Sequence, residues 1–499
     1  MTRHLPILIV MLPLAGAVVA PIIGRASVGA VRLVCLATLV LSHLAALLAL
    51  RVVLVSGPWR YELGGWPPPW GIEYVVDALS GGMAVLISFL AVVTAVYRGG
   101  PAAGASGLAA AAPYALHALL AAGLLGIVLT GDAFNLYVFL EISSLSAYAL
   151  LAGGEARGLV AVFRYLLVGT IAASFYLLGI GHLYALTGTL NMADLAARLP
   201  GIADTAPAVT GLALVVVGLA IKMAVFPLHG WLPDAYTYAP APAASFVASA
   251  MSKVGAYALL RVLFFVFEGA ETAARALDLL AGAAALAMVA GSVMALAQDD
   301  VRRMLAYSSV GHMGYVVLGF GLGNPAGLTG ALLHVANHGV MKACLFMVAG
   351  NVLLRAGTVR VAGYAGMARR LPLTLAAFGV AALSMIGLPP AGGFFSKWYL
   401  IQGALQRGSW IYVAAIVASS LLTAAYMFRV LENAYLRAPA ADGAEGLLPA
   451  GPPAGARHEA PASMVAPVLA LALAVLALGL WNQALVDGVV APALAGVGR

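Results

Sequence analysis

The chain has 499 residues, of which 63% are hydrophobic and only 9% are charged, and its mean hydropathy is +1.00. Because soluble globular domains carry roughly 25% charged residues, this composition excludes a soluble domain. It predicts an integral membrane protein.

Apolar segments of about 20 residues recur along the chain, and each is long enough to cross a hydrocarbon core of roughly 30 Å as a helix. The first follows Arg3 and precedes small residues, as in a signal peptide, but we interpret it as an uncleaved helix because no soluble ectodomain follows. We expect about fourteen transmembrane helices, at 5–23, 30–53, 74–97, 112–130, 133–153, 160–185, 208–227, 244–267, 274–296, 304–323, 328–354, 372–404, 409–436 and 464–485.

The arginines predict the orientation of these helices. Those in the odd-numbered connections are Arg25, Arg98, Arg157, Arg302, Arg303, Arg355, Arg360, Arg369, Arg370, Arg437 and Arg457, whereas the even-numbered ones and the termini hold Arg3, Arg60, Arg198, Arg275, Arg407 and Arg499. By the positive-inside rule, the odd-numbered connections are cytoplasmic and both termini face outward, across the inner (plasma) membrane of a prokaryote. The net charge of +7 follows from this asymmetry and gives no reason to expect nucleic acid binding.

Motifs for cofactors and nucleotides are missing from the sequence. The only cysteines, Cys35 and Cys344, lie in apolar helices, so a disulfide framework, a CxxC pair and a CxxCH haem site are excluded. The sequence has no GxxxxGK[ST] phosphate loop and no insertion large enough for a nucleotide domain. We therefore expect no cofactor in this chain and an energy source bound elsewhere.

Two connections differ in composition from the rest. Residues 54–73 are rich in Trp, Pro and Gly, which predicts an external hairpin with aromatic anchors at the interface. Residues 437–463 are rich in Ala, Pro and Gly, which predicts a cytoplasmic linker. A plain spacer is the simplest interpretation of both.

Two predicted helices combine a lysine with prolines, in opposite order. In the seventh helix Lys222 precedes Pro227, whereas in the twelfth Pro389 and Pro390 precede Lys397. Transporters often contain two inverted repeats, each with a broken helix at the functional site. We expect an all-α membrane fold with two inverted five-helix repeats, helices 4–8 and 9–13, in which helices 7 and 12 are broken. The expected domains are the N-terminal helices with the hairpin (1–110), the two repeats (111–270 and 271–436), the linker (437–463) and the last helix (464–499).

All four lysines lie inside predicted membrane helices, at Lys222, Lys253, Lys342 and Lys397. A charged residue at the centre of a membrane helix costs about 2.5–3.5 kcal/mol by insertion scales. Arginine stays protonated in essentially any protein environment, whereas a lysine removed from water can release its proton near neutral pH. The distribution predicts lysines that carry protons rather than fixed charges.

Glu141 lies in the middle of the fifth predicted helix, and its nearest charges in the sequence are Asp132 and Glu155. A partner must come from another helix, and Lys222 is the natural candidate. A static ion pair that joins two helices is one interpretation. The other is a pair whose strength changes as its neighbours gain or lose protons.

The eleventh predicted helix carries His334, His338 and Lys342 at i, i+4 and i+8, on one face, with Asn337 at its border. A zinc site is the competing interpretation of His-x3-His, but that face has no carboxylate or thiol except Cys344, so we expect no metal. A stripe of His and Lys suits a chain of proton donors and acceptors.

Lys253 lies in the eighth predicted helix, with Ser249 and Ser252 nearby. It either takes part in a relay or extends toward the cytoplasmic interface. Lys397 follows a Pro-Pro-Ala-Gly-Gly break, where freed carbonyls can bind water or a cation, and we interpret it as a terminal proton-exchange site. Three roles stay open: His312 hydrates a bend or is a hydrogen-bonded core histidine, and Arg429 and Glu432 suit structural or interface charges.

Several motifs in fixed order resemble the antiporter-like proton-channel subunits shared by Mrp cation/proton antiporters, respiratory complex I and membrane-bound hydrogenases. They are GDAFNLYVFLEISSLSAYAL, IKMAVFPLHGWLPDAYTYAP, SKVGAYALLR, DDVRRMLAYSSVGHMGY, HVANHGVMKACLF and SMIGLPPAGGFFSKW. The resemblance covers helices three to thirteen and implies fourteen helices, inverted repeats and proton movement along a polar axis in the middle of the membrane. Carried over by position, it implies that the functional residues are Glu141, Lys222, Lys253, His334, His338 and Lys397.

Within this family, WPPPWGIEYVVDALS looks most like the D-type subunit of Mrp antiporters, and Lys397 departs from the type of complex I subunit that has glutamate there. We therefore expect a proton-translocating subunit of a Mrp-type Na+/H+ antiporter, with other membrane subunits as partners. The alternative is a proton-pumping subunit of a complex I-like oxidoreductase or membrane-bound hydrogenase. Rivals from other classes are a quinone-binding redox subunit and an inactive membrane scaffold.

Overall fold

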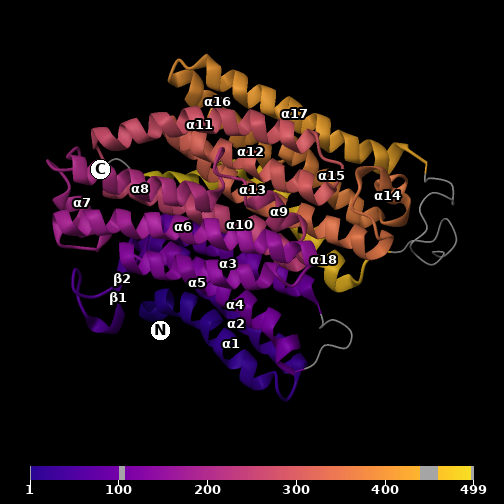
Figure 1. Ribbon diagram of the computed structural model, residues 1–499, viewed down its shortest axis with the longest axis horizontal. Helices are drawn as coiled ribbons and strands as arrows, with labels where there is room; N and C mark the ends of the chain where they lie inside the picture. The colour runs from indigo at the N-terminus through magenta and orange to yellow at the C-terminus, as the bar shows by residue number, and fades with distance from the viewer. Residues whose placement is uncertain (1, 100–106, 439–458, 496–499) are drawn as a thin grey trace.

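The computed structural model describes residues 2–99, 107–438 and 459–495. Most of these residues form helices that run side by side along the longest axis of the molecule (Figure 1). Both termini and the only strands in the described ranges lie at one end of the bundle. We refer to this end as the outer end and to the opposite one as the inner end.

The N-terminal part consists of four helices and a hairpin. The elements are α1 (Leu5–Ile23), α2 (Val28–Ser56), β1 (Trp59–Glu62), β2 (Glu73–Val76), α3 (Ala78–Arg98) and α4 (Gly107–Leu129). The strands pair antiparallel within the segment expected to be an external hairpin, and Trp66 and Trp70 between them are exposed. Asp77 begins α3 through a reciprocal capping box with Ser80, which satisfies two backbone N–H groups.

The middle of the chain contains a helix that ends inside the predicted seventh span. The elements are α5 (Ala133–Leu151), α6 (Ala156–Thr187), α7 (Met192–Arg198), α8 (Ala206–Met223), α9 (Leu232–Thr237) and α10 (Ala241–Arg261), which continues as a π-helical segment, Val262–Val266. Ala224 closes α8 with a φ of 56°, a conformation that costs roughly 1–2 kcal/mol for a residue with a Cβ. Pro227 follows in the non-helical connection.

The last part contains the second interruption. The elements are α11 (Glu271–Leu296), α12 (Val301–Gly321), α13 (Pro325–Ala356), α14 (Met367–Arg370), α15 (Pro372–Ile386), α16 (Gly392–Gln406), α17 (Trp410–Leu436), α18 (Ala462–Leu480), α19 (Asn482–Leu485) and α20 (Ala491–Leu494). Gly387 ends α15 with a φ of 94°, which a glycine adopts without strain, and Pro389 and Pro390 follow before α16 begins. The chain therefore leaves the helical conformation at both expected breaks.

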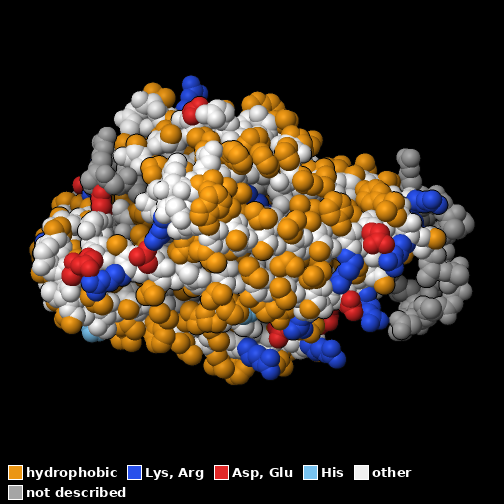
Figure 2. Space-filling view, turned by 90° about the horizontal axis from the view of Figure 1, so that it is seen from above, with side chains coloured by type: hydrophobic (Ala, Val, Ile, Leu, Met, Phe, Trp, Pro, Cys, Tyr) orange, Lys and Arg blue, Asp and Glu red, His pale blue; other side chains and the backbone are white. Residues whose placement is uncertain are grey.

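Twelve helices of the described ranges are long and apolar enough to cross a membrane. The other two expected positions hold α12, which has two arginines in its first turn, and the pair α15 and α16, with 15 residues each. The number fourteen therefore stays a prediction. In Figure 2 the middle of the visible face is largely hydrophobic, and most charged side chains lie toward the two ends.

The expected linker 437–463 lies largely outside the described residues, as do Arg457 and Arg499. Its described end contributes to the fold. The Glu459 carboxylate accepts hydrogen bonds from the backbone N–H groups of Leu373 and Thr374, at 2.6 and 3.2 Å. Glu459 therefore caps the first turn of α15 from a distant point of the chain, so this end of the segment is more than a spacer.

Candidate proton path

The fifth and seventh predicted spans meet at the only intramembrane ion pair that joins a lysine to a carboxylate in the described ranges. Lys222 Nζ on α8 lies 3.6 Å from Glu141 Oε1 on α5 and donates a hydrogen bond to Ser144 Oγ at 2.7 Å. The Lys222 side chain is 7% exposed and that of Glu141 is 27% exposed. Glu141 thus contacts the lysine that the sequence suggested, and part of its side chain is exposed at the surface of the chain.

A small cavity adjoins Lys222 between α4, α5, α8 and α10. Its volume is ≈20 Å³, and Ser143, Ser144, Leu219 and Gly255 are among the residues that line it. A space of this size accommodates roughly one water molecule. We refer to it as the Lys222 cavity. The hydroxyl groups in its wall give a proton on Lys222 polar neighbours inside an otherwise apolar bundle.

Lys253 on α10 is fully buried. Its ammonium group donates to the Ala248 carbonyl at 2.6 Å and lies 3.4 Å from Ser252 Oγ. The side chain therefore does not extend to the cytoplasmic interface, which was the alternative left open by the sequence. Within the described part of the chain, no carboxylate lies within 4 Å of Lys253, Lys342 or Lys397, so Lys222 differs from the other three.

Three buried histidines from two helices form a stack. His312 on α12 and His334 on α13 are joined by a hydrogen bond of 3.0 Å between Nδ1 and Nε2, and His334 Nδ1 lies 2.9 Å from Ser396 Oγ on α16. The ring of His338 stacks on those of His312 and His334, with centroids 5.1 and 5.8 Å away. Both ring nitrogens of His334 are therefore engaged, one with His312 and the other with Ser396.

The other polar residues of α13 connect it to its neighbours. Lys342 Nζ donates to the Leu305 carbonyl on α12 at 2.7 Å and also bonds Ser308 Oγ. Asn337 Nδ2 donates to the Gly392 carbonyl at the start of α16, at 2.8 Å. The stripe seen in the sequence therefore divides, because the histidines stack together while Lys342 turns toward α12.

Lys397 on α16 reaches back across the second helix break. Its ammonium group donates to the Met385 and Ile386 carbonyls, both at 2.9 Å, and to Ser420 Oγ on α17 at 3.0 Å. It also lies 4.9 Å from the centroid of the Tyr315 ring. The sequence suggested that freed carbonyls at this break bind water or a cation, and the cation they bind is Lys397 itself. Two of its three ammonium hydrogens thus have acceptors at the negative end of α15, and the third has the Ser420 hydroxyl on α17.

Sequence reasoning left several contributors unassigned or missed them. His312, whose role the sequence left open, is a member of the histidine stack and shares a hydrogen bond with His334. We refer to the candidate proton-carrying side chains together as the row: Glu141, Lys222, Lys253, His312, His334, His338, Lys342 and Lys397. The hydroxyl groups of Ser144, Ser308, Ser396 and Ser420 each bond a lysine or histidine of the row. The only signal was a general enrichment of Ser near these motifs, which does not tell which hydroxyl faces inward.

Arg429 and Glu432 lie outside the row. Arg429 Nη1 donates to the Leu296 carbonyl at the end of α11, at 3.0 Å. Glu432 pairs with Arg437 at 3.0 Å near the end of α17. The Arg429 bond joins α17 to α11, whereas the Glu432–Arg437 pair is local to the end of α17.

A helical membrane protein with a row of buried Lys and His side chains and one partly buried Glu among its helices belongs to the class of polytopic ion-transport proteins. More specifically, the chain belongs to the family described as "NADH:quinone oxidoreductase/Mrp antiporter, TM", whose model matches residues 130–423. That range contains every candidate residue from Glu141 to Lys397.

Similar proteins come from two kinds of assembly. The chain is 52% identical to NADH-quinone oxidoreductase subunit N of Desulforudis audaxviator (strain MP104C) over 99% of both chains. It is 33% identical to the D-type Na(+)/H(+) antiporter subunit of Alkalihalophilus pseudofirmus over 77% of each. Among solved structures, a chain of the membrane-bound sulfane sulfur reductase, an archaeal respiratory membrane complex, matches with a TM-score of 0.90 and 29% identity over 99% of this chain and 98% of that one.

Proposed function

We propose that this antiporter-like membrane subunit translocates protons along a route that runs from Lys222 to Lys397. A proton enters from the inner end, binds Lys222 beside Glu141, and passes by way of Lys253 and the histidine stack to Lys397. Lys342 lies one helical turn from His338 and forms a side branch toward α12. The observation that supports this route is that the helices carrying its residues are neighbours. They pack against one another in the order α8, α10, α13, α12 and α16.

The physical requirement for such a route is a group that holds a charge and then gives it up. An ammonium group in hydrocarbon is costly unless it is paired or hydrogen-bonded, and each lysine of the row has at least one acceptor. One charge that crosses the membrane potential is worth about 2.3 kcal/mol per 100 mV. A change in one neighbouring charge alters the energy of a buried ammonium by a similar amount, so each transfer is matched to the driving force.

The type of complex is best inferred from the extent of similarity. The hairpin motif favoured a Mrp D-type subunit, but a relative 52% identical over 99% of both chains carries the name NADH-quinone oxidoreductase subunit N, and the D-type antiporter relative is 33% identical over 77%. We therefore favour a redox-driven respiratory complex over a Na+/H+ antiporter. The redox centres then belong to partner subunits, because the sequence of this chain has no iron–sulfur or haem motif.

We further propose that the inner end, which carries Arg302, Arg303, Arg369 and Arg370, faces the cytoplasm of a prokaryotic cell. Both termini and the hairpin then lie on the periplasmic side. The two breaks, after α8 and after α15, mark corresponding positions in the proposed repeats, 111–270 and 271–436. The remaining proposed units are 1–110, the linker 437–463 and the last helix, 464–499.

The test of the route exchanges the lysine that begins it. Lys222→Arg keeps the positive charge but prevents release of the proton, and Lys222→Met removes the charge. Both variants, assembled in the native complex and reconstituted in vesicles, are expected to abolish substrate-driven proton uptake. Arg429→Lys, a charge-conserving exchange outside the row, is the matched control and is expected to keep it. Full uptake by Lys222→Arg in an assembled complex would contradict the route, and full uptake by Lys222→Met would favour the inactive scaffold.

A separate experiment decides the type of complex. The tagged chain is isolated from native membranes in mild detergent and its partners are identified by mass spectrometry. Subunits that carry iron–sulfur clusters or flavin support a redox-driven pump, whereas a set of small antiporter subunits without redox centres supports the Mrp type. A redox centre bound to this chain after separation from its partners would instead favour the quinone-binding rival.

A further inference from the structure

A large cavity lies at the outer end of the bundle, away from the proposed row. Its volume is ≈660 Å³, and its walls come from the end of α2, the hairpin, α3, α7, α10 and the C-terminal α20. We refer to it as the outer cavity. Most of its wall is apolar, but four charged side chains also line it, Arg60, Glu73, Asp77 and Arg261.

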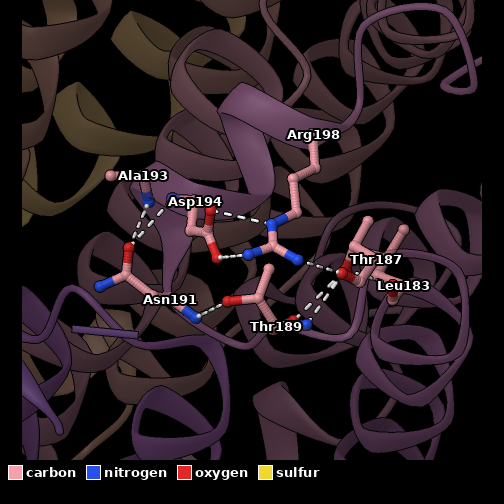
Figure 3. Close-up of polar contacts among 7 residues, drawn as sticks. All are labelled: Leu183, Thr187, Thr189, Asn191, Ala193, Asp194 and Arg198. Atoms are coloured by element: carbon pink, nitrogen blue, oxygen red, sulfur yellow. Dashed lines mark hydrogen bonds and ion pairs between the residues drawn. The ribbon is translucent and has the colours of Figure 1, made fainter. Parts of the chain in front are cut away.

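One wall of the outer cavity is α7, which contributes Met192, Ala193 and Ala196, and Figure 3 shows the hydrogen bonds at the turn between α6 and α7. Asn191 caps α7 by accepting from the Ala193 N–H at 3.1 Å, and Arg198 donates to Asp194 and to the Thr187 carbonyl, both at 2.9 Å. Asn191 Nδ2 also donates to Glu73 Oε1 at 2.7 Å, which ties the turn to the hairpin. This bond joins residues 118 positions apart and links two elements that line the cavity, the hairpin and α7.

Three side chains, Asp77, Tyr257 and Arg261, lie at the bottom of the outer cavity, on the side that faces the interior of the bundle. We refer to them as the outer floor. Arg261 Nη2 lies 2.5 Å from Asp77 Oδ2, and its Nε donates to the Tyr257 hydroxyl at 2.9 Å. The Tyr257 hydroxyl donates in turn to the Val128 carbonyl on α4 at 2.6 Å. The Arg261 side chain is only 11% exposed, so a guanidinium group and its bonds fill the space between α3, α4 and α10.

The Lys222 cavity lies directly beneath this floor. Ile127 near the end of α4 lines the Lys222 cavity, and Thr130 just after α4 lines the outer cavity. On α10, Ala258 lines the Lys222 cavity and Arg261 lines the outer cavity. Three residues of helix, about 4.5 Å along the axis, therefore separate the two cavities. Lys222 lines the cavity beneath the floor and does not line the outer cavity.

We propose that the outer cavity is an outward-facing vestibule and that the outer floor is a gate between it and Lys222. The barrier is steric: the Arg261–Asp77 ion pair and the hydrogen bond from Arg261 to Tyr257 fill the space through which water would connect the outer cavity to Lys222. The closed floor keeps Lys222 from exchanging protons with the outside while it is loaded from the inner end. This inference rests on the proposed function, since it assumes that Lys222 carries a transported proton.

The first test measures which cavity a water-soluble reagent reaches. In a chain with Cys35→Ser and Cys344→Ser, Ala196→Cys places a thiol in the outer cavity and Ala258→Cys places one beneath the floor. A membrane-impermeant cationic thiosulfonate is added to assembled complexes from either side of the membrane. We expect Ala196→Cys to react from the outside at least about tenfold faster than Ala258→Cys. Equal rates with the floor intact would overturn the gate.

The second set of variants opens the floor. Asp77→Asn combined with Arg261→Gln removes both charges, and Asn still caps α3. Tyr257→Phe removes one hydroxyl and keeps the ring, which guards against a misfolded double variant. Either change is expected to expose Ala258→Cys to the outer reagent. The matched control is Asp194→Asn, which breaks an ion pair within α7 and is expected to leave Ala258→Cys protected.

Passive proton flux completes the test. Under a potassium diffusion potential without substrate, the opened floor is expected to leak protons about tenfold faster than the wild type, and adding Lys222→Met is expected to stop the leak. Protected Ala258→Cys in every floor variant, or a leak that persists with Lys222→Met, would overturn the proposal. Reaction of Ala196→Cys only from the cytoplasmic side would overturn the proposed orientation, and driven transport that survives Lys222→Met would overturn the proposed route, each independently of the gate.

Discussion

Replacement of Glu141 by glutamine removes the one carboxylate that balances a lysine of the row. The two charged atoms lie 3.6 Å apart, which at an effective dielectric constant of about 20 corresponds to an attraction of about 4–5 kcal/mol. Because the Glu141 side chain is 27% exposed, screening by water or polar neighbours reduces this to about 2 kcal/mol. The protonated form of Lys222 loses that stabilisation in Glu141→Gln, whereas the shape of the site and the hydrogen bond to Ser144 are retained.

A loss of about 2 kcal/mol in a loading step slows it about 30-fold. The assay is substrate-driven acidification or alkalinisation of vesicles that contain the assembled complex, followed with a pH-sensitive dye. Glu141→Asp, which keeps the charge on a shorter side chain, serves as the control and is expected to restore part of the rate. The reasoning fails if Glu141→Gln transports protons at more than half of the wild-type rate, since the pair would then be a static link between α5 and α8.

Three further changes test other parts of the row. Lys397→Met leaves two α15 carbonyls without their donor, at about 1–3 kcal/mol each, so the complex should unfold at a lower temperature and lose transport. His338→Gln should reduce proton flux more than thermal stability, because its ring makes stacking contacts only, whereas the same change at His117, a buried histidine outside the row, should leave flux intact. Gly393→Ala brings a methyl group against the Ser384 carbonyl and should prevent assembly of the complex. Its control is Gly230→Ala, which has nothing within 4 Å of the new Cβ and should be neutral. Equal effects of the two variants on assembly would show that packing at the second break is not limiting.

The positions of the charged groups could be read from the sequence because charge in hydrocarbon is rare and expensive. Four lysines and one glutamate stand out in apolar helices, and only a contact between helices balances Glu141. The helix breaks were equally accessible, since Pro227, Pro389 and Pro390 interrupt segments that are otherwise helical in pattern. In these cases one physical constraint acts on one residue, and no knowledge of the packing is required.

The partners of these groups could not be predicted in the same way. Ser144 meets Lys222 across 78 positions of sequence, and Asp77 meets Arg261 across 184. A serine in a membrane helix can satisfy its hydroxyl group on its own backbone, as Ser143 does with the Leu140 carbonyl, so its presence does not indicate a role. The choice among such serines depends on the rotation and crossing of helices, which the sequence pattern does not specify.

The two lysines at the helix breaks are balanced by different kinds of partner. Lys222 faces a carboxylate, whose charge changes when it gains or loses a proton, whereas Lys397 faces the Met385 and Ile386 carbonyls, whose dipoles are fixed. A fixed partner keeps the energy of a proton at Lys397 nearly constant through the cycle. A titratable partner allows that energy to vary at Lys222, and Glu141 is partly exposed at the surface of the chain, where a neighbouring subunit can influence it. Control of transport by the rest of a complex is therefore expected to enter through Glu141 and Lys222 rather than through the second break.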